Sequence, residues 1–225
     1  MEHLGILTVA NIPGLVDARD ALLRIGNRFA KLDESTKNKY AHRESKFSFG
    51  WSHGVENLEG KPDLSKGSFY ANPEFDNPVA NQQLIAKYPA FIHPNIWPTD
   101  DCPELEPAFK ALGQLIVMVG RLIAAQCDKY VKSVCESYRG NLLHDTIDES
   151  LCCKARLLHY FPIDASQLPS EDEENFSSWC GWHNDHGTLT GLVSAMFMDS
   201  DGNVVENTDP SAGTSNLSIL YFIYW

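Results

Sequence analysis

A short segment near the end of the chain, WCGWHNDHGTLTGLVSAMFMD, gathers side chains that could carry out chemistry. His183 and Asp185 stand two positions apart, directly ahead of an apolar run that is typical of a strand. In an extended chain, residues two apart point to the same side, so this imidazole and this carboxylate could hold one metal ion. The same residues could form an acid/base pair, or a polar turn that caps a buried strand. The spacing alone leaves these three possibilities open.

The metal hypothesis has a definite chemical form. One imidazole and one carboxylate on one face, completed by a distant second histidine, make the facial triad of non-haem Fe(II) oxygenases. Three protein ligands on one side of the ion leave coordination positions for a chelating co-substrate and for O₂. His186 follows His183 by three positions and points to the other face of an extended strand. We therefore expect His186 to lie outside the ligand set.

Composition argues against several kinds of partner. The 225 residues include 18 Lys and Arg against 30 Asp and Glu, which gives a net charge of −12. Without a basic patch, binding to nucleic acid or to an anionic membrane surface is not expected. The start of the chain does not resemble a signal peptide, and no apolar stretch approaches the length of a membrane span. The six cysteines form no CxxC pair, so we predict a protein of the reducing cytoplasm.

The elements around the segment change in type along the chain. Residues 6–13 predict a strand, and apolar residues from Leu15 to Phe29 have helical spacing. Residues 42–80 predict loops with short extended pieces, and a long helix is expected to begin near Asp100 and to end near Ser137. Residues 153–162, 188–199 and 217–225 predict strands. This order predicts an α+β protein, with a mainly helical region over 1–150 and a β region over 151–225.

The segment that contains His183 and Asp185 resembles a known motif. WHNDHGTLTGL is similar to the WHxDxGxLT signature of the plant-type 2-oxoglutarate- and Fe(II)-dependent oxygenases, the isopenicillin N synthase-like branch. RLLHYFP, at 156–162, resembles the RLNYYP strand of that family, and STKNKY, at 35–40, resembles part of its N-terminal segment. The resemblance covers nearly the whole chain as far as about residue 213. It implies a helical N-terminal segment packed on a double-stranded β-helix, or jelly roll.

The resemblance also implies an activity and a set of ligands. A member of this family is an oxidoreductase that uses Fe(II), 2-oxoglutarate and O₂ to hydroxylate or desaturate a small organic molecule. His183 and Asp185 correspond to two of the iron ligands. His159 takes the position of the family's co-substrate asparagine and Tyr160 follows it, so we take both as candidates for binding 2-oxoglutarate. Phe161 stands where the family has the co-substrate tyrosine.

The sequence departs from the family beyond this motif. The family's second histidine ligand lies some fifty residues after the first two ligands and is followed by an Arg-x-Ser that binds the distal carboxylate. Here no His follows His186 and no Arg follows Arg156. We therefore expect a C-terminally truncated jelly roll that is inactive on its own. The uncharged segment LSILYFIYW resembles nothing that the family places there and is expected to form an exposed, aggregation-prone sheet edge.

Two other functions remain open from the sequence. The chain could be a non-catalytic, truncated product of such a gene that acts as a binding or interaction module. It could also be a cupin-like protein with a different metal, in which His159 supplies the third ligand. The partner expected for the oxygenase is a small-molecule substrate. The sequence determines neither the substrate nor the oligomeric state.

Overall fold

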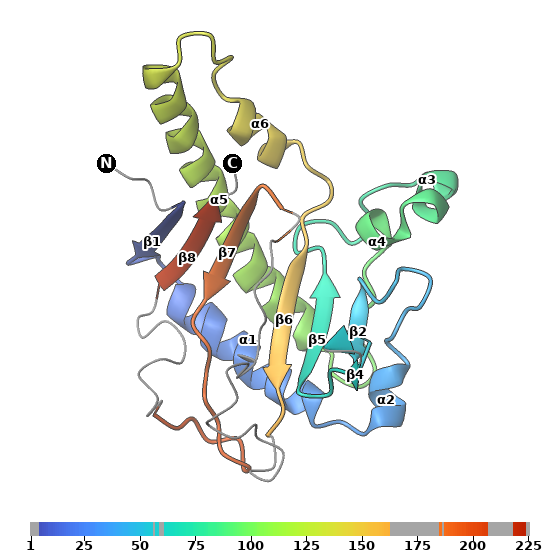
Figure 1. Cartoon of the computed structure of the whole chain (residues 1–225). Coiled ribbons are helices and arrows are strands. Elements are labelled where there is room, and N and C mark those ends of the chain that lie inside the picture. Colours follow the sequence, from blue (N-terminus) through green and yellow to red (C-terminus); the bar gives the residue numbers. More distant parts are fainter. Residues whose placement is uncertain are drawn as a thin grey trace.

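The computed structural model describes residues 5–55, 57–58, 61–162, 185, 187–206 and 218–223 (Figure 1). The chain combines helices and strands, as expected for an α+β protein, but five of the strands that the structure describes lie among the helices of the first 150 residues. They are β1 (Ile6–Ala10), α1 (Leu15–Ala30), α2 (Glu34–Asn38), β2 (Gly50–His53), β3 (Asn57–Leu58), β4 (Lys61–Pro62), β5 (Lys66–Ala71), α3 (Gln82–Lys87), α4 (Pro89–Ile92), α5 (Leu105–Val134), α6 (Leu142–Asp148), β6 (Ala155–Tyr160), β7 (Leu189–Val193) and β8 (Ser218–Ile223).

Two three-stranded sheets carry most of the strands. One has the order β1-β8-β7 and the other β2-β5-β6, and every pairing within them is antiparallel. Both sheets combine strands from before residue 150 with strands from after it. The long connections between paired strands therefore bring the two ends of the chain together, β1 lying beside β8 (Figure 1).

The helices α1 and α5 pack against each other and lie behind the strands in Figure 1. The sequence of α1 explains this, because Leu15, Leu22 and Phe29 recur at helical spacing and are 1%, 5% and 1% exposed. From α5, the ring of Phe109 packs edge-on against that of Phe69 in β5, with 6.1 Å between centroids. These contacts form one apolar core that joins both helices to the sheet β2-β5-β6.

The long helix agrees with its prediction in the middle and differs at its ends. It spans Leu105–Val134, with Glu104 as its N-cap. It therefore begins after the predicted start near Asp100 and ends before Ser137. Contrary to the sequence-based expectation about apolar stretches, α5 is long and apolar enough to cross a membrane by length and composition. Core helices of soluble proteins pass the same test, and nine residues of α5 are buried.

The C-terminal strand corrects one expectation. β8 lies between β1 and β7 and pairs with both, so it is the centre of its sheet. Ile219 of β8 is fully buried in the common core. The prediction that this segment forms an exposed edge is therefore wrong, because β1 from the start of the chain covers the side of β8 that β7 leaves open.

Candidate functional site

The carboxylate of Asp185 lies just ahead of β7, as the sequence predicts, and is half-buried. The hydroxyl of Thr190, the second residue of β7, donates a hydrogen bond to Asp185 Oδ2 at 2.8 Å. This contact fixes the side chain at the mouth of the strand. Such hydrogen bonds to a ligating carboxylate are typical of metal sites, because they orient the oxygen that binds. His183 and His186 lie outside the described residues.

His159 lies on the side of β6 that faces the helices. Its neighbour Leu157 contacts Gly26 of α1, and side chains two apart on a strand share a face. The His159 ring meets the ring of Phe161 edge-on, with 4.8 Å between centroids. Burial lowers the pKa of His159, and the positive charges of Lys31 and Lys37 lower it further. The imidazole is therefore kept neutral in an apolar, cationic environment.

Tyr160 lies on the opposite face of β6 and is 41% exposed. Since His159 and Tyr160 are adjacent on the strand, they point to different faces, so β6 does not bring this predicted co-substrate pair together. Tyr160 also ends β6, whereas Asp185 precedes β7, and the two strands run in the same direction in Figure 1. The two residues therefore belong to opposite ends of their strands.

A complete metal site is not formed by the described residues alone. Among the described ranges, no group of three or more His, Cys, Asp or Glu side chains is placed to hold a metal ion. The cupin-like alternative, with His159 as the third ligand beside His183 and Asp185, stays a prediction for the same part of the chain. Because His183 lies outside those ranges, the pairing of His183 with Asp185 stays a prediction.

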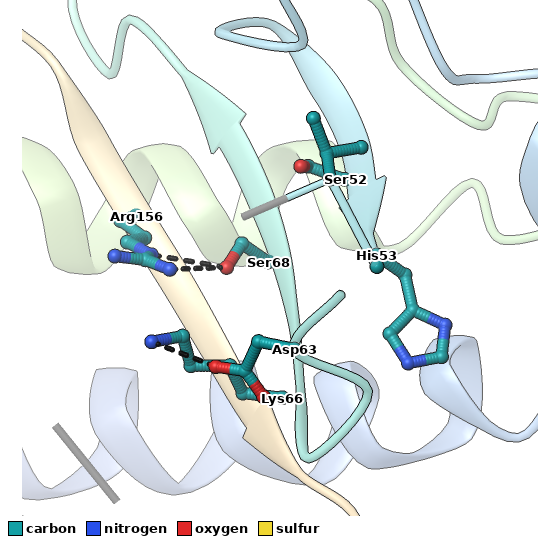
Figure 2. Close-up of a pocket in the computed structure, with 8 residues that line it drawn as sticks. Ser52, His53, Asp63, Lys66, Ser68 and Arg156 are labelled. Carbon is teal, nitrogen blue, oxygen red and sulfur yellow. Dashed lines mark hydrogen bonds and ion pairs between the residues drawn. The ribbon is translucent and has the colours of Figure 1, made fainter. Parts of the chain in front are cut away.

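A set of mostly polar side chains, to which no sequence pattern pointed, lies on the face of β5 and β6 that points away from the helices (Figure 2). We call this the front face, and it comprises Lys66, Ser68, Tyr70, Arg156, Leu158 and Tyr160. The cross-strand pairs Lys66–Tyr160, Ser68–Leu158 and Tyr70–Arg156 follow from the antiparallel register. The alternation of polar and apolar residues within KGSFYA and within ARLLHY is typical of amphipathic strands. Nothing in the sequence indicates that these two strands pair.

Comparison with solved structures identifies the architecture. A 2OG-Fe(II) oxygenase family protein from Caulobacter crescentus superposes with a TM-score of 0.62 over 97% of this chain, at 21% sequence identity. The chain has the fold of the 2OG-Fe(II) oxygenases. A full-length Neurospora crassa protein, solved in complex with alpha-KG, superposes with a TM-score of 0.64 over 97% of the chain, at 16% identity. The same Neurospora protein has also been solved with alpha-KG and 5-formyluracil together, and that structure superposes with a TM-score of 0.63.

The similarity to this fold is structural and not close in sequence. No family model and no curated protein matches the sequence. The chain spans 64% of the length of the Caulobacter protein and 63% of that of the Neurospora protein in complex with alpha-KG. The resemblance found from the motif is thus confirmed at the level of the fold.

Proposed function

We propose that this protein is a non-haem Fe(II)- and 2-oxoglutarate-dependent oxygenase that hydroxylates or desaturates a small organic molecule. The observation that carries the proposal is Asp185, a carboxylate oriented by Thr190 at the mouth of β7, in a chain with the fold of the 2OG-Fe(II) oxygenases. The Neurospora complexes with alpha-KG and 5-formyluracil support a small-molecule substrate. The two sheets then correspond to parts of a double-stranded β-helix, and the helices to the segment that packs on it.

The sequence supplies two of the three protein donors that an Fe(II) site of this kind uses, and no His follows His186 to supply the third. His183 and Asp185 would supply an imidazole and a carboxylate from one side of an extended segment, which are two members of the facial triad. When bound, Fe(II) supplies Lewis-acid and O₂-activating chemistry. The protein's own part would be to orient the Asp185 oxygen through the Thr190 hydroxyl. Tyr160, at the opposite end of its strand from Asp185, is not placed to hold 2-oxoglutarate beside that carboxylate.

Anaerobic titration tests the proposal directly. Purified protein is mixed with Fe(II) and then with 2-oxoglutarate, and the visible charge-transfer band of the chelate is followed. A band in the wild type that is lost in both His183→Ala and Asp185→Ala supports the proposal, and it would mean that a third ligand lies within these 225 residues, contrary to the expectation from the sequence. His186→Ala is the matched control, since we expect that imidazole to lie outside the ligand set, and the variant should keep the band.

A second pair of variants examines the contact seen in the structure. Thr190→Val removes the hydroxyl that orients Asp185 but keeps the side-chain shape, and we expect Fe(II) affinity to fall by about tenfold or more. Thr190→Ser restores the donor and should recover most of the affinity. A wild-type protein that is folded by circular dichroism but forms no band would contradict the oxygenase proposal and favour a non-catalytic binding module.

A further inference from the structure

A closed loop over residues 42–49 lies between α2 and β2, and we call it the 42–49 loop. The N–H of Trp51 donates to the backbone oxygen of Tyr40 at 2.9 Å, which joins the two ends of the loop. Within it, Lys46 and Phe47 have φ values of 55° and 57°. Two successive non-glycine residues in the left-handed region are strained, so other contacts must hold the loop in this conformation.

The imidazole of His42 supplies one of these contacts. The N–H of Ser45 donates to His42 Nδ1 at 3.1 Å, and the Ser45 hydroxyl donates to the backbone oxygen of His42 at 2.9 Å. Ser45 is 0% exposed, so water is not an alternative partner for its N–H. Only an unprotonated Nδ1 can accept this hydrogen bond. Protonation at Nδ1 would therefore leave a buried N–H without an acceptor, which is costly.

The ring of His42 also stacks on that of His93, which follows α4. The two ring centroids are 4.1 Å apart and the ring planes are tilted by 37°. Burial lowers the pKa of His93, and the charges of His42 and Lys154 lower it further, against the opposite effect of the Pro94 carbonyl. The two stacked rings are therefore most compatible as a neutral pair, because positive charges on both would repel each other.

Two charged side chains face this pair from different elements. Lys154 Nζ, from the segment before β6, donates to a backbone oxygen of the loop at 2.6 Å. Burial lowers the pKa of Lys154 to about 7, so acidification also charges this amine, which opposes positive charge on His93. Glu44 Oε2 lies 3.3 Å from His42 Nε2, but Glu44 is 78% exposed and solvent screens the contact. A protonated His42 would thus keep a weak partner in Glu44 and lose a buried one.

We propose that the 42–49 loop is an acid-sensitive latch, which is closed while His42 is neutral and opens when His42 is protonated. Opening would release the strained backbone of the loop and uncover Phe49, which is 0% exposed and whose ring lies 5.7 Å from that of His93. Imidazoles change charge between about pH 5 and pH 8, so opening is expected within this range. The latch does not rest on the oxygenase function.

Amide hydrogen exchange measures opening of the latch directly. Four successive residues, Ser45, Lys46, Phe47 and Ser48, donate their backbone N–H groups within the loop. Protection factors are determined by NMR at about pH 7.5 and about pH 5.5, each corrected for the intrinsic exchange rate at that pH. In the wild type, we expect the protection of these amides to fall by about tenfold or more at the lower pH. Amides of the β5–β6 pairing should keep their protection.

Two substitutions of His42 separate the acceptor from the charge. His42→Asn supplies a neutral amide oxygen that can accept the Ser45 N–H at any pH, so the loop should stay protected at both pH values. His42→Phe keeps a ring that can stack but has no acceptor, so protection should be low at both. His144→Asn is the matched control, because His144 is a partly exposed histidine of α6, and it should behave as the wild type does.

Each further outcome also decides the matter. Equal protection of the loop at both pH values in the folded wild type overturns the proposal. So does a His42→Asn variant that loses protection at the lower pH as the wild type does, because another group would then be responsible. Loss of protection in β5–β6 together with the loop would show that acid unfolds the whole sheet and that no separate latch exists. Circular dichroism at both pH values establishes that each variant is folded.

Discussion

The imidazole of His159 combines burial with nearby positive charge. It lies between β6 and the helices, with its ring 4.8 Å from that of Phe161, and Lys31 and Lys37 both disfavour its protonation. A residue in this environment is suited to packing as a neutral ring. It contrasts with Asp185, whose carboxylate is oriented by the Thr190 hydroxyl and lies at the start of a strand. At the scale of single residues, the structure thus separates a half-buried histidine that packs as a neutral ring from a candidate ligand.

The pKa of His159 gives a prediction with a definite sign. Because its folded-state pKa is below the ordinary 6.5, the unfolded chain takes up a proton first as pH falls. The stabilisation from the neutral ring is therefore complete above about pH 6.5 and is lost as pH falls below it toward the folded-state pKa. NMR of the ring should show a titration midpoint below 6.5. Lys31→Gln should raise that midpoint, and a wild-type midpoint at or above 6.5 would reject this account.

At the scale of elements, the spacing of apolar residues predicts those helices and strands whose pattern is contained in one segment of the sequence. The spacing of Leu15, Leu22 and Phe29 predicts α1, and the apolar runs predict β1, β6 and β7 close to where they lie. The sequence also predicts the position of Asp185 before a strand. It does not predict which strands pair, since that depends on the assembled core. The contact of Arg156 with Ser68 spans 88 positions, and no local pattern in either strand indicates it.

Arg19 links two elements that are far apart in sequence. It lies on the buried side of α1, is 8% exposed, and its Nε donates to the backbone oxygen of Ser194 at 2.8 Å. A second bond, from Nη2, reaches the backbone oxygen of Ala195. These bonds tie the residues that follow β7 to α1. We expect Arg19→Ala to lower the free energy of unfolding by about 2–3 kcal/mol, because charged hydrogen bonds are lost.

Arg24→Ala is the control for this prediction, because Arg24 is an exposed arginine of the same helix. It should change the free energy of unfolding by less than about 0.5 kcal/mol. Urea denaturation of both variants at one pH measures the difference. Equal effects of the two substitutions would mean that Arg19 does not link α1 to the segment after β7.

At the scale of the whole molecule, the two sheets share one core. Ile219 of β8 belongs to the same cluster of buried side chains as Trp51 of β2 and Phe69 of β5. The paired strands of each sheet also come from both sides of residue 150. A core that is shared in this way couples the stability of the regions 1–150 and 151–225. The two regions are then expected to unfold together.

Hydrogen exchange on an Ile219→Ala variant tests this coupling. Ile219 is fully buried, so its truncation should cost about 2–5 kcal/mol. If the molecule unfolds as one cooperative unit, exchange of the slowest amides should accelerate equally in β1–β8 and in β5–β6, although β5 lies in the other sheet. Leu192→Ala, on β7 and 48% exposed, is the control and should accelerate neither region strongly. Unchanged protection of β5–β6 in Ile219→Ala would show instead that the sheet β2-β5-β6, with its helices, is stable without the sheet that contains both ends of the chain.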